Sequence, residues 1–154
     1  MVAIVAEAHE RHVASLALLA GPARARFAVS GHSYAEAYGT LTRGGERAPF
    51  GFTAGEAWAA LASLRSATGL VGLTAAQTFE ATGRYAASGG IGPRLCDALI
   101  GGAAVVHGIP GIVTWNVGHM RGLFPNLDVL TPEAFAARRA RAPTPPPNKS
   151  SARP

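Results

Sequence analysis

The apolar run Leu95–Val106 (LCDALIGGAAVV) constrains the fold more than any other segment, because it carries a single charge, Asp97. A helix that is apolar on every side is buried between other elements. A carboxylate in such a place loses hydration, which is costly unless a cation or several donors meet it. Asp97 should therefore face something positive, and a divalent metal is one candidate. The alternative is an acid in the first turn of a helix, stabilised by the helix dipole and by neighbouring Arg94.

The composition is that of one folded domain. The chain has 154 residues, of which 48% are hydrophobic and 15% are charged, enough for a substantial core. A single cysteine, Cys96, excludes an internal disulfide framework and is taken to exclude any cysteine-based zinc site. No apolar run is long enough for a membrane span, and residues 1–10 lack the basic start and cleavage site of a signal peptide. These features predict a cytoplasmic protein with no membrane association.

The net charge of +5 is concentrated at one end of the chain. Residues 1–137 hold as many arginines as acidic residues, and this segment is expected to be the folded domain. Residues 138–154 (RRARAPTPPPNKSSARP) form a basic, Pro-rich tail that is predicted to be disordered. Such a tail can add sequence-independent attraction to RNA, or it can simply keep the protein soluble.

Short apolar strands alternate with helices along the chain, which predicts a parallel sheet with helices on its faces. Strands are expected at residues 27–29, 70–73, 112–114 and 127–130. Helices are expected at residues 1–19, 33–43, 54–64, 75–87 and 93–107. In such sheets, ligands bind beyond the carboxyl ends of the strands.

Three polar residues fall at this edge: Glu36 after the first strand, Asp97 near the start of the apolar helix, and Asn116 after strand 112–114. Two carboxylates over an open position suit Mg²⁺ or Mn²⁺. Asn116 could accept from a metal-bound water or donate to a phosphate oxygen. Each residue has an alternative reading: Glu36 as the partner of Ser33 in a capping box, and Asn116 as a turn residue. His119, three residues further on, is expected to be a packing residue.

With these residues in place, the chain resembles a PIN-domain protein of the VapC toxin type. The resemblance rests on GGIGPRLCDALIGGAAVVHGIPGIVTWNVGHM, on GLFPNLDVLTP and on the earlier FAVSGHSYAEAYGTLTR, and it covers roughly residues 3 to 135. It implies a three-layer α/β/α domain with a parallel central sheet. It also implies a magnesium-dependent endoribonuclease of a type II toxin–antitoxin system, with Glu36 and Asp97 as metal-binding acids. Asn116 stands where many relatives carry a further acid. The implied partners are an RNA substrate, a cognate antitoxin and a second copy of the chain.

One part of the family pattern is missing. Members of this family open with an apolar strand that ends in an Asp and a small hydroxyl residue, whereas MVAIVAEAHERHVASLALL looks like the helix after that strand. The first strand and the first catalytic acid are therefore absent, and we expect the natural reading frame to begin upstream of Met1. Two interpretations follow: a ribonuclease, or a truncated, inactive PIN-like domain that binds an antitoxin or RNA. Because two acids hold Mg²⁺ more weakly than three or four, this chain is expected to have little activity.

Overall fold

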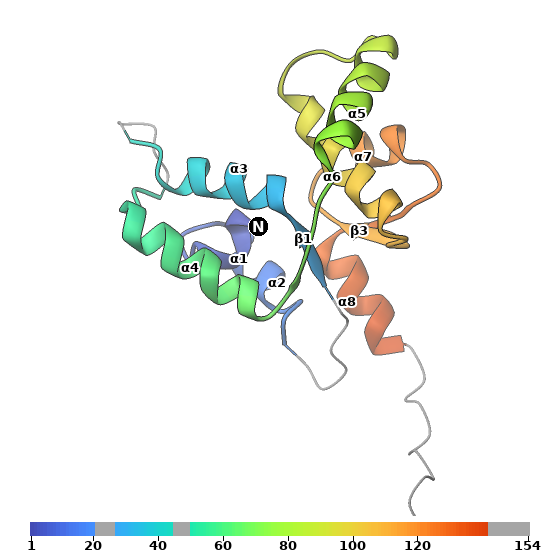
Figure 1. Ribbon diagram of the computed structural model, residues 1–154. Coiled ribbons are helices and arrows are strands. Elements are labelled where there is room, and N and C mark those ends of the chain that lie inside the picture. The colour runs from blue at the N-terminus through green and yellow to red at the C-terminus, as the bar shows by residue number, and fades with distance from the viewer. Residues whose placement is uncertain (21–26, 45–49, 142–154) are drawn as a thin grey trace, which may run out of the picture.

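The protein is a mixed α/β molecule in which helices predominate (Figure 1). The computed structural model describes residues 1–20, 27–44 and 50–141. In chain order, the elements of these ranges are α1 (Val2–Val5), α2 (His12–Leu16), β1 (Ala28–Ser30), α3 (Gly31–Leu41), α4 (Ala54–Ser66), β2 (Gly69–Val71), α5 (Ala75–Ala87), the 3-10 turn η1 (Gly92–Arg94), α6 (Leu95–Val106), β3 (Gly111–Val113), α7 (Val117–Leu123), β4 (Asp128–Leu130) and α8 (Pro132–Arg141).

The strands pair in parallel, as the alternation of strands and helices predicts. β1 pairs with β2 through Val29 and Leu70, and β3 pairs with β4 through Ile112 and Val129. Each pair is joined by helical connections, as parallel strands require. Within the described ranges, however, the two pairs remain separate two-stranded sheets. A single central sheet is therefore not formed by these residues.

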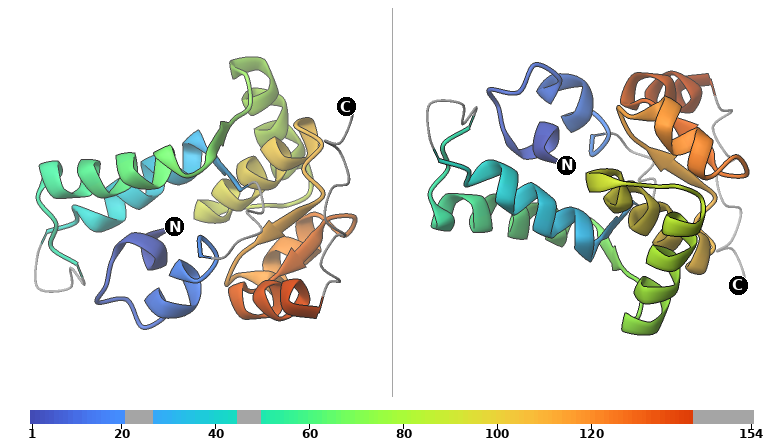
Figure 2. Two further views of the ribbon diagram at one scale, coloured as in Figure 1. Left: turned by 90° about the horizontal axis from the view of Figure 1, so that it is seen from below. Right: turned by 90° about the horizontal axis from the view of Figure 1, so that it is seen from above.

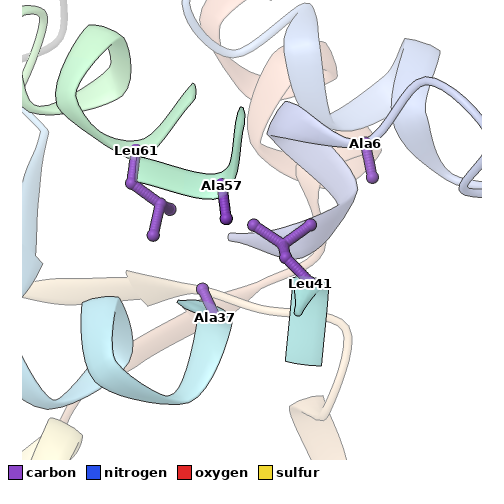
Figure 3. Packing of buried hydrophobic residues seen from close by; sticks show 5 residues of the cluster. All are labelled: Ala6, Ala37, Leu41, Ala57 and Leu61. Carbon is purple, nitrogen blue, oxygen red and sulfur yellow. The ribbon is translucent and has the colours of Figure 1, made fainter. Parts of the chain in front are cut away.

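The side of the molecule that contains α1, α3 and α4 has its own apolar core (Figure 3). Leu41 at the end of α3 is fully buried, and Leu61 of α4 is 2% exposed. Ala6, Ala37 and Ala57 complete this cluster. The small alanine side chains allow the helices to approach closely, so the two leucines fill the space between them.

The helix that carries Asp97, α6, packs against α3, α5 and α7. Its small residues make these contacts possible. A Cβ atom on Gly101 would lie within 2.6 Å of three ring atoms of Phe124, so only glycine fits at this position without a shift. The predicted burial on every side is only partly correct, because Val105 and Val106 at the end of α6 are half exposed.

The N-terminal region differs from the single helix expected over 1–19. It forms α1 and α2, separated by turns in which the N–H groups of His9 and His12 donate to carbonyls three residues earlier. α2 lies beside α8 (Figure 2). The indole of Trp115 donates to the hydroxyl of Ser15 in α2 at 3.2 Å. This segment therefore bends back toward the C-terminal helix instead of continuing as one rod.

Two helices were not expected from the sequence, namely α7 and α8. α8 continues to Arg141, so residues 138–141, which were expected to be part of a disordered tail, are helical. The rest of that tail, 142–154, lies outside the described residues. Among the helices of the described ranges, none combines the length and the apolar character needed to cross a membrane.

Candidate functional site

Asp97 lies in the first turn of α6 and is held by residues of the segment after β3. The side-chain amide of Asn116 donates to Asp97 Oδ2 at 2.8 Å. The ring nitrogen Nε2 of His119 lies 3.5 Å from the same oxygen. Within the described residues Arg94 makes no ion pair with Asp97, so the partner of this acid is not the neighbouring arginine. The predicted proximity of Asp97 and Asn116 is present in the structure.

His119 belongs to this group, although the sequence suggested only a packing role. The side chains of His119 and Asp97 are 20% and 24% exposed. His119 Nε2 is enclosed and makes no hydrogen bond to the described residues, so a proton on it would pair with the Asp97 carboxylate. The spacing Asn116-x-x-His119 was the available signal, because residues three apart at a helix start lie on one side.

Glu36 is not a capping residue. The N-cap of α3 is Ser30, whose hydroxyl accepts from the backbone N–H of Ser33 at 3.0 Å. The proposed alternative, a capping box from Ser33 to Glu36, is therefore wrong. Glu36 lies in the second turn, exposed, and one of its carboxylate oxygens lies within 4.8 Å of the Cys96 sulfur.

Cys96 precedes Asp97 on α6 and lies near Glu36, and both acids affect its thiol. Burial raises the pKa of its thiol to about 11, and the hydrogen bond to Glu36 and the negative charges of Glu36 and Asp97 act in the same direction. A neutral thiol is the stable form here at ordinary pH. Such a thiol reacts slowly, because the thiolate is the nucleophilic form.

Glu36 and Asp97 line one cavity of about 580 Å³. Ser30 of β1 and Thr114 after β3 also line it, together with apolar residues of all four strands. The two acids therefore reach the same space from α3 and α6. Their convergence at the carboxyl ends of β1 and β3 follows the predicted arrangement.

A second set of possible metal ligands shares Glu36. One ligand atom each from His32, Glu36 and Cys96 lies within 4.8 Å of the other two. The expectation that a single cysteine argues against a zinc site overlooked such a mixed set. His32 and Glu36 lie one helical turn apart on α3, which was a visible signal, but their proximity to Cys96 depends on the packing of α3 against α6.

Searches of protein-family models, of curated proteins and of solved structures each found no match to this chain. The function is therefore inferred from the geometry of this site together with the motifs of the sequence.

Proposed function

We propose that the protein is a metal-dependent endoribonuclease of the toxin type, cytoplasmic, with Glu36 and Asp97 as its Mg²⁺- or Mn²⁺-binding acids. The observation that carries this proposal is the convergence of both carboxylates on one cavity, with Asn116 bonded to one of them. The resemblance of the sequence to PIN-domain toxins supplies the substrate class, RNA. It also supplies the partners, an antitoxin and a second copy of the chain.

The donor set fits a hard cation. Glu36 and Asp97 offer carboxylate oxygens, which Mg²⁺ and Mn²⁺ prefer. The hydrogen bond from Asn116 Nδ2 engages only one oxygen of Asp97. When bound, such an ion lowers the pKa of a water molecule and neutralises charge that develops on a phosphate.

The protein's own contribution is positioning. Asn116 holds the Asp97 carboxylate through its amide N–H, which leaves the amide oxygen free to accept from water. His119 Nε2 lies 3.5 Å from the same Oδ2 and limits the space in which the carboxylate can rotate. Fixed ligands of this kind lower the cost of organising a metal site.

We infer further that the two strand pairs are the two halves of one α/β/α sheet. All four strands run parallel to their partners. β1 and β3 each pair on one side only within the described ranges, and residues of both strands line the cavity. The central strand that the resemblance implies would lie between them, and it would bring the missing acid to the carboxyl edge.

Cleavage of a mixed RNA substrate with and without Mg²⁺ or Mn²⁺ tests the function. Glu36→Gln and Asp97→Asn should each reduce metal-dependent cleavage at least ~100-fold, as expected when a metal ligand is lost. Glu80→Gln is the matched control, because Glu80 is an exposed acid on α5 that pairs only with Arg84 in the described ranges. Cleavage that survives both site substitutions, or that falls equally with the control, would exclude this site.

The second candidate is an inactive PIN-like domain that binds RNA or an antitoxin without cleavage. It is favoured by the small number of acids, since two carboxylates offset little of the dehydration cost of Mg²⁺. Under this reading, RNA is retained in a gel-shift assay and no cleavage occurs even at high Mn²⁺.

A further inference from the structure

We propose that His32, Glu36 and Cys96 form a binding site for Zn²⁺, separate in chemistry from the proposed magnesium site. The three ligand atoms lie within 4.8 Å of one another. His32 and Glu36 project from one face of α3, because residues four apart on a helix are neighbours. Cys96 comes from the start of α6, which packs against α3.

The distances are close to those of a zinc site. Zinc binds sulfur at about 2.3 Å and nitrogen or oxygen at about 2.0–2.2 Å, so the ligand atoms of a tetrahedral site are roughly 3.3–3.8 Å apart. Since no two of the three atoms are more than 4.8 Å apart, they need to move together by at most about 1.5 Å to reach this spacing. Rotations of the His32 and Glu36 side chains can supply this movement, because Glu36 is exposed and His32 only partly buried.

His32 gives an independent indication of a bound ligand. Its ring nitrogen Nε2 is enclosed and has no hydrogen-bond partner among the described residues. An enclosed polar atom without a partner is unfavourable and requires an explanation such as an ion. A metal bound by His32 Nε2 would remove this deficit.

The donor types select the metal. A thiolate, an imidazole and a carboxylate form the three-ligand zinc site that leaves a fourth position for water. Mg²⁺ prefers oxygen ligands and binds thiolate sulfur poorly, so Cys96 disfavours it at this site. Binding forms an S–Zn bond and breaks the S–H bond, and the thiol proton passes to solvent.

Zinc binding does not depend on the proposed ribonuclease activity. Glu36 belongs to both ligand sets, so zinc would remove one of the two carboxylates available to Mg²⁺. That consequence alone rests on the proposed function.

The experiment uses the full chain and two probes, Co²⁺ and Zn²⁺. Co²⁺ should give the near-ultraviolet charge-transfer band of a thiolate ligand, and one equivalent of Zn²⁺ should abolish this band. Cys96→Ser should eliminate the band, and His32→Ala should weaken binding at least ~10-fold. His107→Gln is the matched histidine control, because His107 bonds to Gly72 at a different place, and it should leave the band and the affinity unchanged.

A second measurement avoids any effect of the substitutions on folding. Since Cys96 is the single cysteine of the chain, protection of the unmodified protein from iodoacetamide by Zn²⁺ reports on this one thiol. No band and no protection would overturn the proposal, as would a band unchanged in His32→Ala. Asp97→Asn separates the two proposals: it should abolish metal-dependent RNA cleavage while the cobalt band persists.

Discussion

The close contact between Gly101 and Phe124 gives a sharp test of how α6 is positioned. α6 carries both Cys96 and Asp97, and its approach to the end of α7 depends on the absence of a side chain at position 101. A Cβ atom there would lie within 2.6 Å of three atoms of the Phe124 ring. Gly101→Ala should therefore force the ring to move by about 1 Å or more to reach ordinary contact distance.

Gly102 supplies a matched control one residue away on the same helix. A Cβ atom on Gly102 would meet Leu73 at 3.5 Å, an ordinary contact. Both substitutions gain about 1 kcal/mol from the higher helix propensity of alanine. In Gly101→Ala alone, an overpacking cost of about 1–3 kcal/mol opposes this gain. The propensity gain cancels in the comparison, so Gly101→Ala should be less stable than Gly102→Ala by about 1–3 kcal/mol.

Urea unfolding followed by far-ultraviolet circular dichroism measures this difference from the two midpoints at a shared m-value. Adding Phe124→Leu to Gly101→Ala should recover most of the loss, so that the double variant is non-additive. Two glycine variants of equal stability, or a loss that Phe124→Leu does not relieve, would refute the packing argument.

Three further predictions concern the thiol, the core and a helix cap. Because the pKa of Cys96 is raised to about 11 from an ordinary 9.0, its alkylation by iodoacetamide at pH 8 without metal should be about 100-fold slower than in urea. Because the folded state holds the thiol proton more tightly than the unfolded state, the contribution of Cys96 to the free energy of unfolding is fully present below pH 9 and is lost as the pH rises toward 11. Urea midpoints measured across this range report the decline. Leu61→Ala should cost about 2–5 kcal/mol by chemical denaturation, whereas Leu70→Ala, at a position 54% exposed, should cost far less. Thr53→Ala removes the hydroxyl that accepts from the Glu56 N–H and should cost about 1 kcal/mol in the same assay.

The local elements were largely predictable. The helix expected over 75–87 is found as Ala75–Ala87, where Thr74 caps the first turn. The four strands lie within two residues of their expected positions, because short apolar runs between turn residues leave little freedom. Residues 1–19 also have apolar residues at helical spacing, yet they form two short helices. Here packing against α3 and α8 overrides the local pattern.

The part of the candidate site that depends on strand topology alone was predictable from the sequence. Glu36, Asp97 and Asn116 were identified because parallel strands bring their carboxyl ends to one edge. His32 and His119 were not assigned to a site, since their roles depend on side-chain contacts between helices. The separation of the strand pairs could not be foreseen either, because the choice of neighbouring strand is a property of the whole fold.

Among the residues that the structure describes, β1 and β3 each pair with one strand only, and this has a consequence for how the protein behaves in concentrated solution. Strand edges with free N–H and C=O groups act as templates for any extended peptide that reaches them. Residues of β1 and β3 line a largely apolar cavity, so an extended peptide that pairs with either edge would gain backbone hydrogen bonds and bury apolar side chains at once. We therefore expect self-association at high protein concentration. A short apolar peptide bound in the cavity should reduce it.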